Sequence, residues 1–179
     1  ARTGIQYQKF NTVYQLMALK QEHPDQLAAT KTFLMVPDYL NYLLCGVAAN
    51  EYTNASTTAL VGADSKDWDD VLIAMLGLPR DIFQSIKMAG TVLGHLTPEM
   101  QAKVGFDAEV ILPATHDTGS AFLAVPARDE FAAYLSSGTW SLLGVENAAA
   151  ITSVDSCAAN FTNEGGYEYR YRYLKNIMG

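Results

Sequence analysis

The sequence predicts an α/β protein in two parts, one helix-rich over residues 1–127 and one β-rich over residues 128–179. Before residue 126, capped segments with helical spacing alternate with short apolar runs. One such run, 110–113, is followed directly by small polar residues, as at the strand-to-helix turns where α/β folds hold reacting groups. After residue 129 the pattern changes to short alternating segments joined by turn residues, which is typical of hairpins.

Composition limits the function classes. The chain has 179 residues, 49% of them hydrophobic and 17% charged, with a formal net charge of −7. These values predict a soluble globular protein with a sizeable core, and the negative charge argues against nucleic acid as a partner. No apolar run reaches the roughly eighteen residues of a membrane span, so we expect no membrane partner and a cytoplasmic location. Cys45 and Cys157 lack metal-site spacing, which favours buried free thiols over a disulfide.

The first part contains several predicted helices with recognisable ends. Asn11 is a good N-cap for a helix reaching Lys20, and Pro24 opens a short helix over residues 25–30. Pro37 starts another helix that Gly46 ends, and the apolar cluster at 39–44 within it predicts core packing.

Further along, Thr53 is expected to cap a short helix, and residues 68–76 form an amphipathic helix that Gly77 ends. Thr97 and Pro98 have the chemistry of an N-cap and a first helical position. A strand over 109–113 and a helix reaching Val125 complete the first part.

In the second part, residues 131–135 and 140–145 predict a hairpin around a turn of small residues. Tyrosines alternate over 167–173 and predict another strand. The basic residues Arg170, Arg172 and Lys175 lie among them, which indicates first a strand face and only secondarily an anion site. Residues 175–179 are typical of the first turn of a helix.

His116 and Asp117 lie at the predicted strand-to-helix turn. Asp117 could act as a general base that takes the proton of an attacking hydroxyl, or it could only cap the helix that starts at Thr118. His116 could bond a sugar hydroxyl or satisfy a backbone carbonyl. The residues alone leave both alternatives open.

Gly138 and Thr139 lie in the hairpin turn, where backbone N–H groups and the threonine hydroxyl could bind a phosphate. An ordinary hairpin turn uses the same residues, so this alternative also stays open. The sequence has no GxxxxGK[ST], GxGxxG, HExxH or GxSxG motif, which excludes P-loop chemistry, and no metal site is predicted.

Several stretches together resemble the FGGY family of carbohydrate kinases, which belongs to the actin-like ATPase (ribonuclease H-like) superfold. The more specific ones are Ser-Ser-Gly-Thr-Trp-Ser at 136–141 and Leu-Lys-Asn-Ile-Met-Gly at 174–179. The others are Arg-Thr-Gly-Ile-Gln at 2–6, Gln-Lys-Phe-Asn-Thr at 8–12, Pro-Asp-Tyr at 37–39, Glu-Tyr-Thr-Asn-Ala at 51–55, His-Asp-Thr at 116–118 and Asn-Glu-Gly-Gly at 163–166.

This resemblance implies transfer of the ATP γ-phosphate to the 1-hydroxyl of a ketose, L-rhamnulose, with Mg²⁺ bridging the phosphates. It implies that Asp117 is the catalytic base and that His116 and Thr118 contact the sugar. Gly138, Thr139 and Asn176 then match nucleotide-binding positions, with no metal-ligating residue assigned in this chain.

The resemblance also implies a central fragment of a longer kinase. Residues 1–127 match the later part of the family's first domain, on the sugar side, and 128–179 match the start of its second domain, on the ATP side. We expect the isolated fragment to be inactive and to self-associate through apolar surface. Two alternatives remain: another ketose kinase of the family, of the xylulose or fuculose type, and a non-catalytic sugar-binding module.

Overall fold

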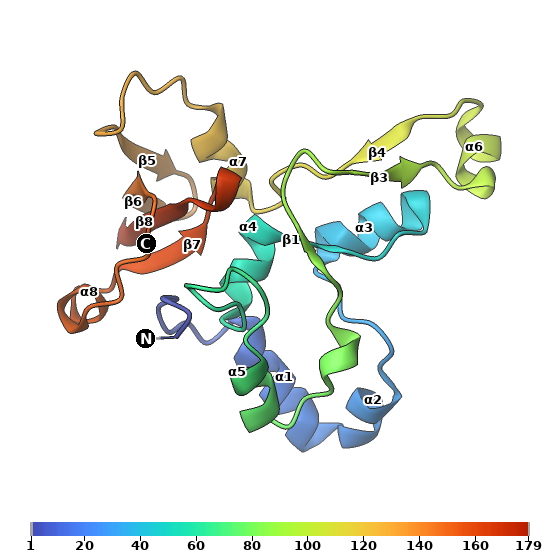
Figure 1. Ribbon diagram of the computed structural model, residues 1–179, viewed down its shortest axis with the longest axis horizontal. Helices are drawn as coiled ribbons and strands as arrows, with labels where there is room; N and C mark the ends of the chain where they lie inside the picture. The colour runs from blue at the N-terminus through green and yellow to red at the C-terminus, as the bar shows by residue number, and fades with distance from the viewer. Residues whose placement is uncertain (1, 179) are drawn as a thin grey trace.

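The computed structural model describes residues 2–178 and mixes helices with strands, as the sequence predicts (Figure 1). The α-helices are α1 Thr12–Glu22, α2 Pro24–Ala29, α3 Val36–Cys45, α4 Tyr52–Ala55, α5 Asp70–Met75, α6 Pro98–Val104, α7 Asp117–Ala124 and α8 Val154–Ala158. The strands are β1 Asn50–Glu51, β2 Ile86–Lys87, β3 Val92–His95, β4 Glu109–Ile111, β5 Ala133–Ser137, β6 Ser141–Asn147, β7 Thr162–Gly165 and β8 Tyr171–Met178. Short 3₁₀ turns cover Ser56–Thr58, Arg80–Ile82 and Tyr167–Tyr169.

The described strands form three sheets. Strands β1 and β2 make a parallel pair, and β3 and β4 make an antiparallel pair. The largest sheet is antiparallel with the order β5-β6-β8-β7, so β8 is an inner strand between β6 and β7. In Figure 1 this sheet lies with α7 and α8 on one side of α4, while α1, α2 and α5 gather on another.

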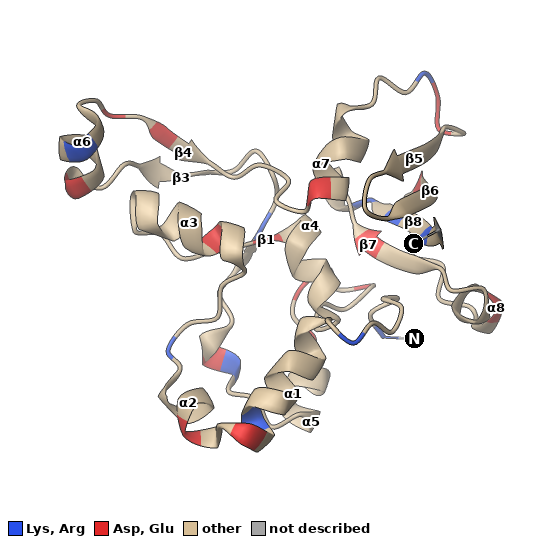
Figure 2. Cartoon of the chain, turned by 180° about the vertical axis from the view of Figure 1, so that it is seen from behind, with Lys and Arg blue, Asp and Glu red and all other residues tan. Residues whose placement is uncertain are grey.

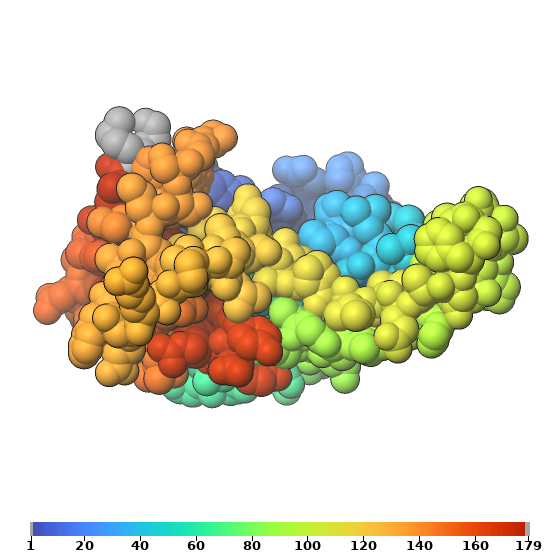
Figure 3. Space-filling view, turned by 90° about the horizontal axis from the view of Figure 1, so that it is seen from above, coloured from blue at the N-terminus to red at the C-terminus, as the bar shows by residue number. Residues whose placement is uncertain are grey.

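The core divides in the same way. One cluster fills the helical region around Trp68 and Tyr52, and a smaller one joins α7 to the large sheet. The larger cluster is Leu16, Leu27, Tyr52, Ala55, Leu60, Val61, Trp68, Ile73, Leu78, Ile82 and Phe83, and the smaller is Phe122, Tyr134 and Leu174. Figure 3 shows the β3–α6–β4 segment at the end of the molecule away from the large sheet.

The two sequence regions meet along α4 and β7. The Gly165 N–H donates to the Ser56 hydroxyl at 2.8 Å, and a Cβ built on Gly165 would lie 2.7 Å from a Tyr52 ring carbon. Only glycine therefore allows this close approach of strand and helix. The boundary near residue 128 stays a prediction; α7 ends at Ala124 and β5 begins at Ala133.

Local signals for helix ends are confirmed at several places. Asn11 occupies the N-cap position of α1, although its side chain makes no capping hydrogen bond, and Gly46 follows α3 in the left-handed region with φ 75°. Thr97 caps α6 by accepting the Met100 N–H, and Pro98 is its first residue. The predicted hairpin is present as β5 and β6.

Two predicted helix starts are wrong. The N-cap of α4 is Glu51 and not Thr53, because the longer Glu51 carboxylate reaches back to the Thr53 and Asn54 N–H groups. Helix α5 starts at Asp70 and not at Trp68, since Asp69 caps it by accepting the Leu72 N–H.

The apolar cluster on α3 is also not core as expected. Tyr39, Leu40 and Leu43 are each about half exposed, and the buried residue of that helix is Asp38. Both cysteines are free, as predicted, but neither is buried: Cys45 is half-buried and Cys157 is exposed.

The end of the sequence differs from expectation as well. Residues up to Met178 continue β8 as a strand paired with β6 and do not begin a helix, because tertiary pairing overrides the local pattern. Residue 179, the last of that predicted turn, lies outside the described residues.

Candidate active-site groove

A buried carboxylate, that of Glu51, holds the turn between β4 and α7 in place. Glu51 is fully buried, and its Oε2 accepts both the Thr115 N–H and the Thr115 hydroxyl at 3.0 Å. The next residue, His116, donates its N–H to the Thr53 hydroxyl at 3.2 Å. The turn that precedes α7 is therefore attached by three hydrogen bonds to α4 and to its N-cap residue Glu51.

Asp117 is the first residue of α7, and His116 occupies the N-cap position. The Asp117 side chain is 96% exposed, and its Oδ1 accepts the N–H of the next residue, Thr118. Asp117 is therefore not the N-cap that a helix starting at Thr118 would need. A carboxylate at this end of a helix is stabilised by the helix dipole and stays available for a ligand.

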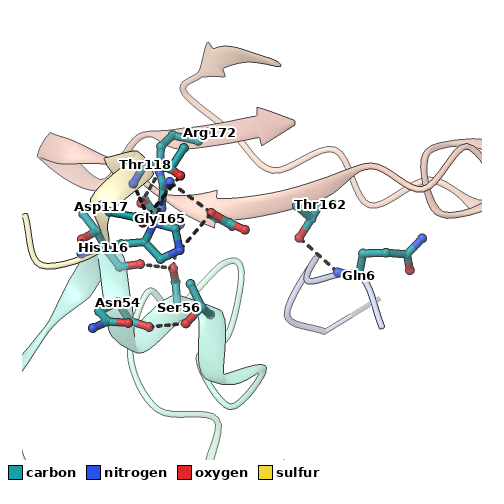
Figure 4. Close-up of polar contacts among 12 residues, drawn as sticks. Gln6, Asn54, Ser56, His116, Asp117, Thr118, Thr162, Gly165 and Arg172 are labelled. Carbon is teal, nitrogen blue, oxygen red and sulfur yellow. Dashed lines mark hydrogen bonds and ion pairs between the residues drawn. The ribbon is translucent and has the colours of Figure 1, made fainter. Parts of the chain in front are cut away.

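His116 lies below Asp117 and is 21% exposed. Its Nδ1 lies 3.3 Å from Arg172 Nη1 and 3.4 Å from Asp117 Oδ1, and its Nε2 lies 3.8 Å from Glu164 Oε2 (Figure 4). Burial lowers the pKa of His116, although the Glu164 carboxylate opposes that effect. The ring is thus a neutral group at physiological pH.

All of the predicted site residues lie on one groove of about 690 Å³. His116, Asp117 and Thr118 reach it from α7, Gly138 and Thr139 from the β5–β6 turn, and Asn176 from β8. Residues of the N-terminal segment, α1 and the loop before α3 form its other walls. The structure therefore brings together two motifs that are about twenty residues apart in the sequence.

The β5–β6 turn is exposed, and one of its N–H groups is already used. The Gly138 N–H donates to the Trp140 carbonyl at 2.8 Å, while a Cβ on Gly138 would meet no atom within 4 Å. Within the described residues, no hydrogen bond engages the Thr139 N–H or hydroxyl. Thr139 is therefore the member of the turn that has donors left for an anion.

Asn176 stands next to this turn and accepts the Ser141 N–H through its Oδ1 at 3.3 Å. The indole of Trp140 packs edge-on against Phe10, with ring centroids 5.5 Å apart. These contacts hold the hairpin turn and β8 against the N-terminal segment.

The sequence indicates no role for Glu164, and it indicates only a secondary anion site for Arg172 and Lys175. Glu164 and Lys175 both line the groove, and fully buried Arg172 lies behind it. Figure 2 shows acidic positions at the start of α7 and on β7, elements that lie next to each other. The only sequence signal was the run of basic residues among tyrosines, which does not show that one arginine of the run is buried.

The described residues contain no group of three histidine, cysteine or acidic side chains placed to hold a metal ion. Of the two other histidines, His95 is exposed and pairs with Asp107 at 2.8 Å, and His23 is exposed as well. No helix among residues 2–178 is long and apolar enough to cross a membrane.

The fold and the groove can be compared with known proteins. The model of the N-terminal domain of the FGGY family of carbohydrate kinases matches residues 1–124. A curated relative from Oceanobacillus iheyensis named rhamnulokinase is 57% identical over 177 residues, which cover 99% of this chain and 37% of the relative. The chain thus spans little more than a third of that relative's length.

Solved structures agree on the fold. A ligand-bound xylulose kinase from Lactobacillus acidophilus superposes with a TM-score of 0.86 at 19% identity, covering 97% of this chain and 35% of that one. Plasmodium falciparum glycerol kinase with ADP gives a TM-score of 0.82 at 17% identity, covering 98% and 36%. The architecture is therefore that of actin-like ATPase sugar kinases, and the chain belongs to the FGGY family of carbohydrate kinases.

Proposed function

We propose that this chain supplies the sugar side and part of the nucleotide side of a kinase that phosphorylates L-rhamnulose at its 1-hydroxyl. The observation that carries the proposal is the convergence of Asp117 and the Gly138–Thr139 turn on one groove. A phosphoryl transfer to a hydroxyl needs a proton acceptor and a phosphate site in the same place. The relative from Oceanobacillus iheyensis, through its name, supports the choice of sugar.

In this proposal Asp117 is the general base. Its exposed carboxylate takes the proton of the 1-hydroxyl as that oxygen bonds to the γ-phosphorus, and the bond between the γ-phosphorus and the ADP oxygen breaks. His116 and Thr118 contact the sugar beside it. The three hydrogen bonds beneath the turn would hold the carboxylate in place while the hydroxyl attacks.

The nucleotide side is supported by the chemistry of its donors. Thr139 has an unengaged N–H and hydroxyl, Gly138 leaves open space, and Lys175 contributes a positive charge to the groove lining. Asn176 adds an amide near the same turn. These groups suit the phosphates of ATP, and the ADP named with the related glycerol kinase fits the same class of ligand.

A magnesium ion would be held mainly by phosphate and water oxygens, because the described residues offer no protein-only set of ligands. When bound, magnesium neutralises charge on the phosphates during transfer. The protein's own part is then to orient the sugar with His116 and Thr118 and to accept the proton with Asp117.

The test is ADP release by the full-length gene product with ATP, magnesium and L-rhamnulose, compared with Asp117→Asn. We expect the variant to lose turnover by a factor of about 10³ or more. Asp155→Asn is a matched control, since Asp155 is also exposed in the first turn of a helix but does not line the groove.

Equal rates for wild type and Asp117→Asn would remove Asp117 from the chemistry. A panel with xylulose and fuculose identifies the sugar, because a higher kcat/KM for either would replace L-rhamnulose as the substrate. Sugar binding without ADP release for any ketose would instead indicate a non-catalytic sugar-binding module.

A further inference from the structure

A row of three charged residues crosses the large sheet and ends at the groove. Glu146 on β6, Arg172 on β8 and Glu164 on β7 stand directly opposite one another in register. Opposed residues of neighbouring strands project from the same face of a sheet. Glu164 lines the groove, whereas Glu146 does not.

Arg172, in the middle of this row, is fully buried and turned toward α7. Its Nε donates to the Gly165 carbonyl at 3.0 Å, and its Nη1 lies 3.0 Å from Glu164 Oε2 and 3.3 Å from His116 Nδ1 (Figure 4). Gly119 on α7 makes room, because a Cβ there would lie 3.4 Å from the Arg172 Cζ.

The contact between Arg172 and His116 fixes the proton on the ring. A guanidinium has only donors, so His116 Nδ1 accepts in this hydrogen bond of 3.3 Å, the shorter of its two polar contacts, since Asp117 Oδ1 lies 3.4 Å away. In a neutral imidazole the proton is then on Nε2. That nitrogen lies 3.8 Å from Glu164 Oε2, the oxygen that also forms the ion pair with Arg172.

We infer that Arg172 and Glu164 are positioning residues for His116. Arg172 occupies Nδ1 and so selects the Nε2–H tautomer, and Glu164 balances the buried guanidinium charge. His116 then offers a fixed N–H donor to a hydroxyl of the ligand. The role of that donor in sugar binding rests on the proposed function, but the selection of the tautomer does not.

The decisive measurement is the tautomer of His116 by imidazole nitrogen chemical shifts in the full-length gene product, labelled on histidine. The signal is assigned by its loss in His116→Asn. We expect the wild type to show the Nε2–H form alone and Arg172→Met to show a mixture of tautomers, because methionine donates no hydrogen bond. A Nδ1–H form in the wild type, or an unchanged tautomer in Arg172→Met, overturns the inference.

Arg172→Met leaves Glu164 without its counter-charge, which endangers folding. The double variant Arg172→Met with Glu164→Gln removes both charges and must show the same mixture of tautomers. Glu146→Gln is the matched control, since Glu146 opposes Arg172 from the other side but does not contact His116. We expect this control to keep the wild-type tautomer.

A pH titration of the same His116 signal distinguishes the loss of a charged neighbour from a general loosening of the structure. The charged groups that act on His116 are Glu164 on β7, Arg172 on β8, Asp117 on α7 and Glu51 before α4. Losing Arg172 removes a positive neighbour and should raise the pKa of His116, whereas Glu164→Gln removes a negative one and should lower it. Equal upward shifts in both variants would indicate loosened structure and contradict the inference.

Kinetics supply a separate readout. With L-rhamnulose, Glu164→Gln and Arg172→Met should raise KM about tenfold or more and change kcat less, because the donor that they orient binds the sugar. If no ketose is turned over by the wild type, the proposed function fails while the tautomer measurement still decides the inference.

Discussion

Two carboxylates at the turn before α7 differ in their solvation: Glu51 lies beneath the groove, and Asp117 opens into it. Glu51 is fully buried and accepts five hydrogen bonds, from the N–H groups of Thr53, Asn54 and Thr115 and from both threonine hydroxyls. Asp117 is almost fully exposed and, among the described residues, accepts hydrogen bonds from Thr118 alone. The two groups are joined through Thr115 and His116.

The two carboxylates of this turn therefore have different roles. The buried carboxylate exchanges water for protein donors and so rigidifies the backbone, as satisfied buried polar groups do. The exposed carboxylate keeps its access to a ligand and contributes little to the fold. Variants at the two positions should therefore separate stability from activity.

The largest effect is expected at Glu51. Glu51→Ala leaves five donors unpaired in a buried site, and we expect a loss of about 3–5 kcal/mol of unfolding free energy. Urea denaturation of the full-length gene product measures it. Glu109→Ala, an exposed carboxylate on β4, is the control and should change stability by less than about 0.5 kcal/mol. An unchanged denaturation midpoint for Glu51→Ala would contradict the structural role of Glu51.

The sequence predicts those parts of this site whose partners lie within a few residues. Thr97 with Pro98, and Gly46 after α3, act through backbone groups of the same turn, so composition and order suffice. Asp117 and His116 are found because they directly follow an apolar strand pattern. The boundary and the roles of the site residues stay predictions.

The missed features depend on partners far along the chain. Glu51 bonds Thr115 across 64 positions, and Arg172 contacts His116 across 56. No local pattern indicates that Arg172 is fully buried while Arg170 and Lys175 of the same basic run are only half-buried. The α3 cluster shows the opposite error, since an apolar helix face predicts burial but the fold leaves Tyr39 and Leu40 half exposed.

The next effect is expected at Asp38, another buried carboxylate. Burial raises the pKa of Asp38 to about 7, against hydrogen bonds from the Glu51 N–H and Asn50 amide that oppose the shift. Because the folded pKa is raised, the fold favours the protonated acid. The stability that this gives is complete below about pH 4 and is lost as the pH rises toward 7.

Asp38→Asn cannot ionise, so its stability relative to wild type should rise by up to about 4 kcal/mol between pH 4 and pH 8. Urea denaturation at a series of pH values measures the difference. Asp69→Asn is the control: Arg2 lowers the pKa of Asp69, so its effect on stability should be flat above pH 5. A flat difference for Asp38→Asn as well would show that Asp38 stays ionised and is satisfied like Glu51.

The smallest effect on stability is expected at Asp117, the proposed general base. Asp117→Asn keeps an oxygen that can accept the Thr118 N–H and loses only an exposed charge, so its melting temperature should stay within about 2 °C of wild type. Thermal unfolding of the same preparation used for ADP release measures it. A larger fall in melting temperature would mean that Asp117→Asn loses turnover because it unfolds more easily. Asp117 would then contribute to stability as Glu51 does, and the two carboxylates would not differ in role. An unchanged melting temperature with lost turnover would instead assign the loss to proton transfer, because the hydrogen bonds of Glu51 below the turn remain in place.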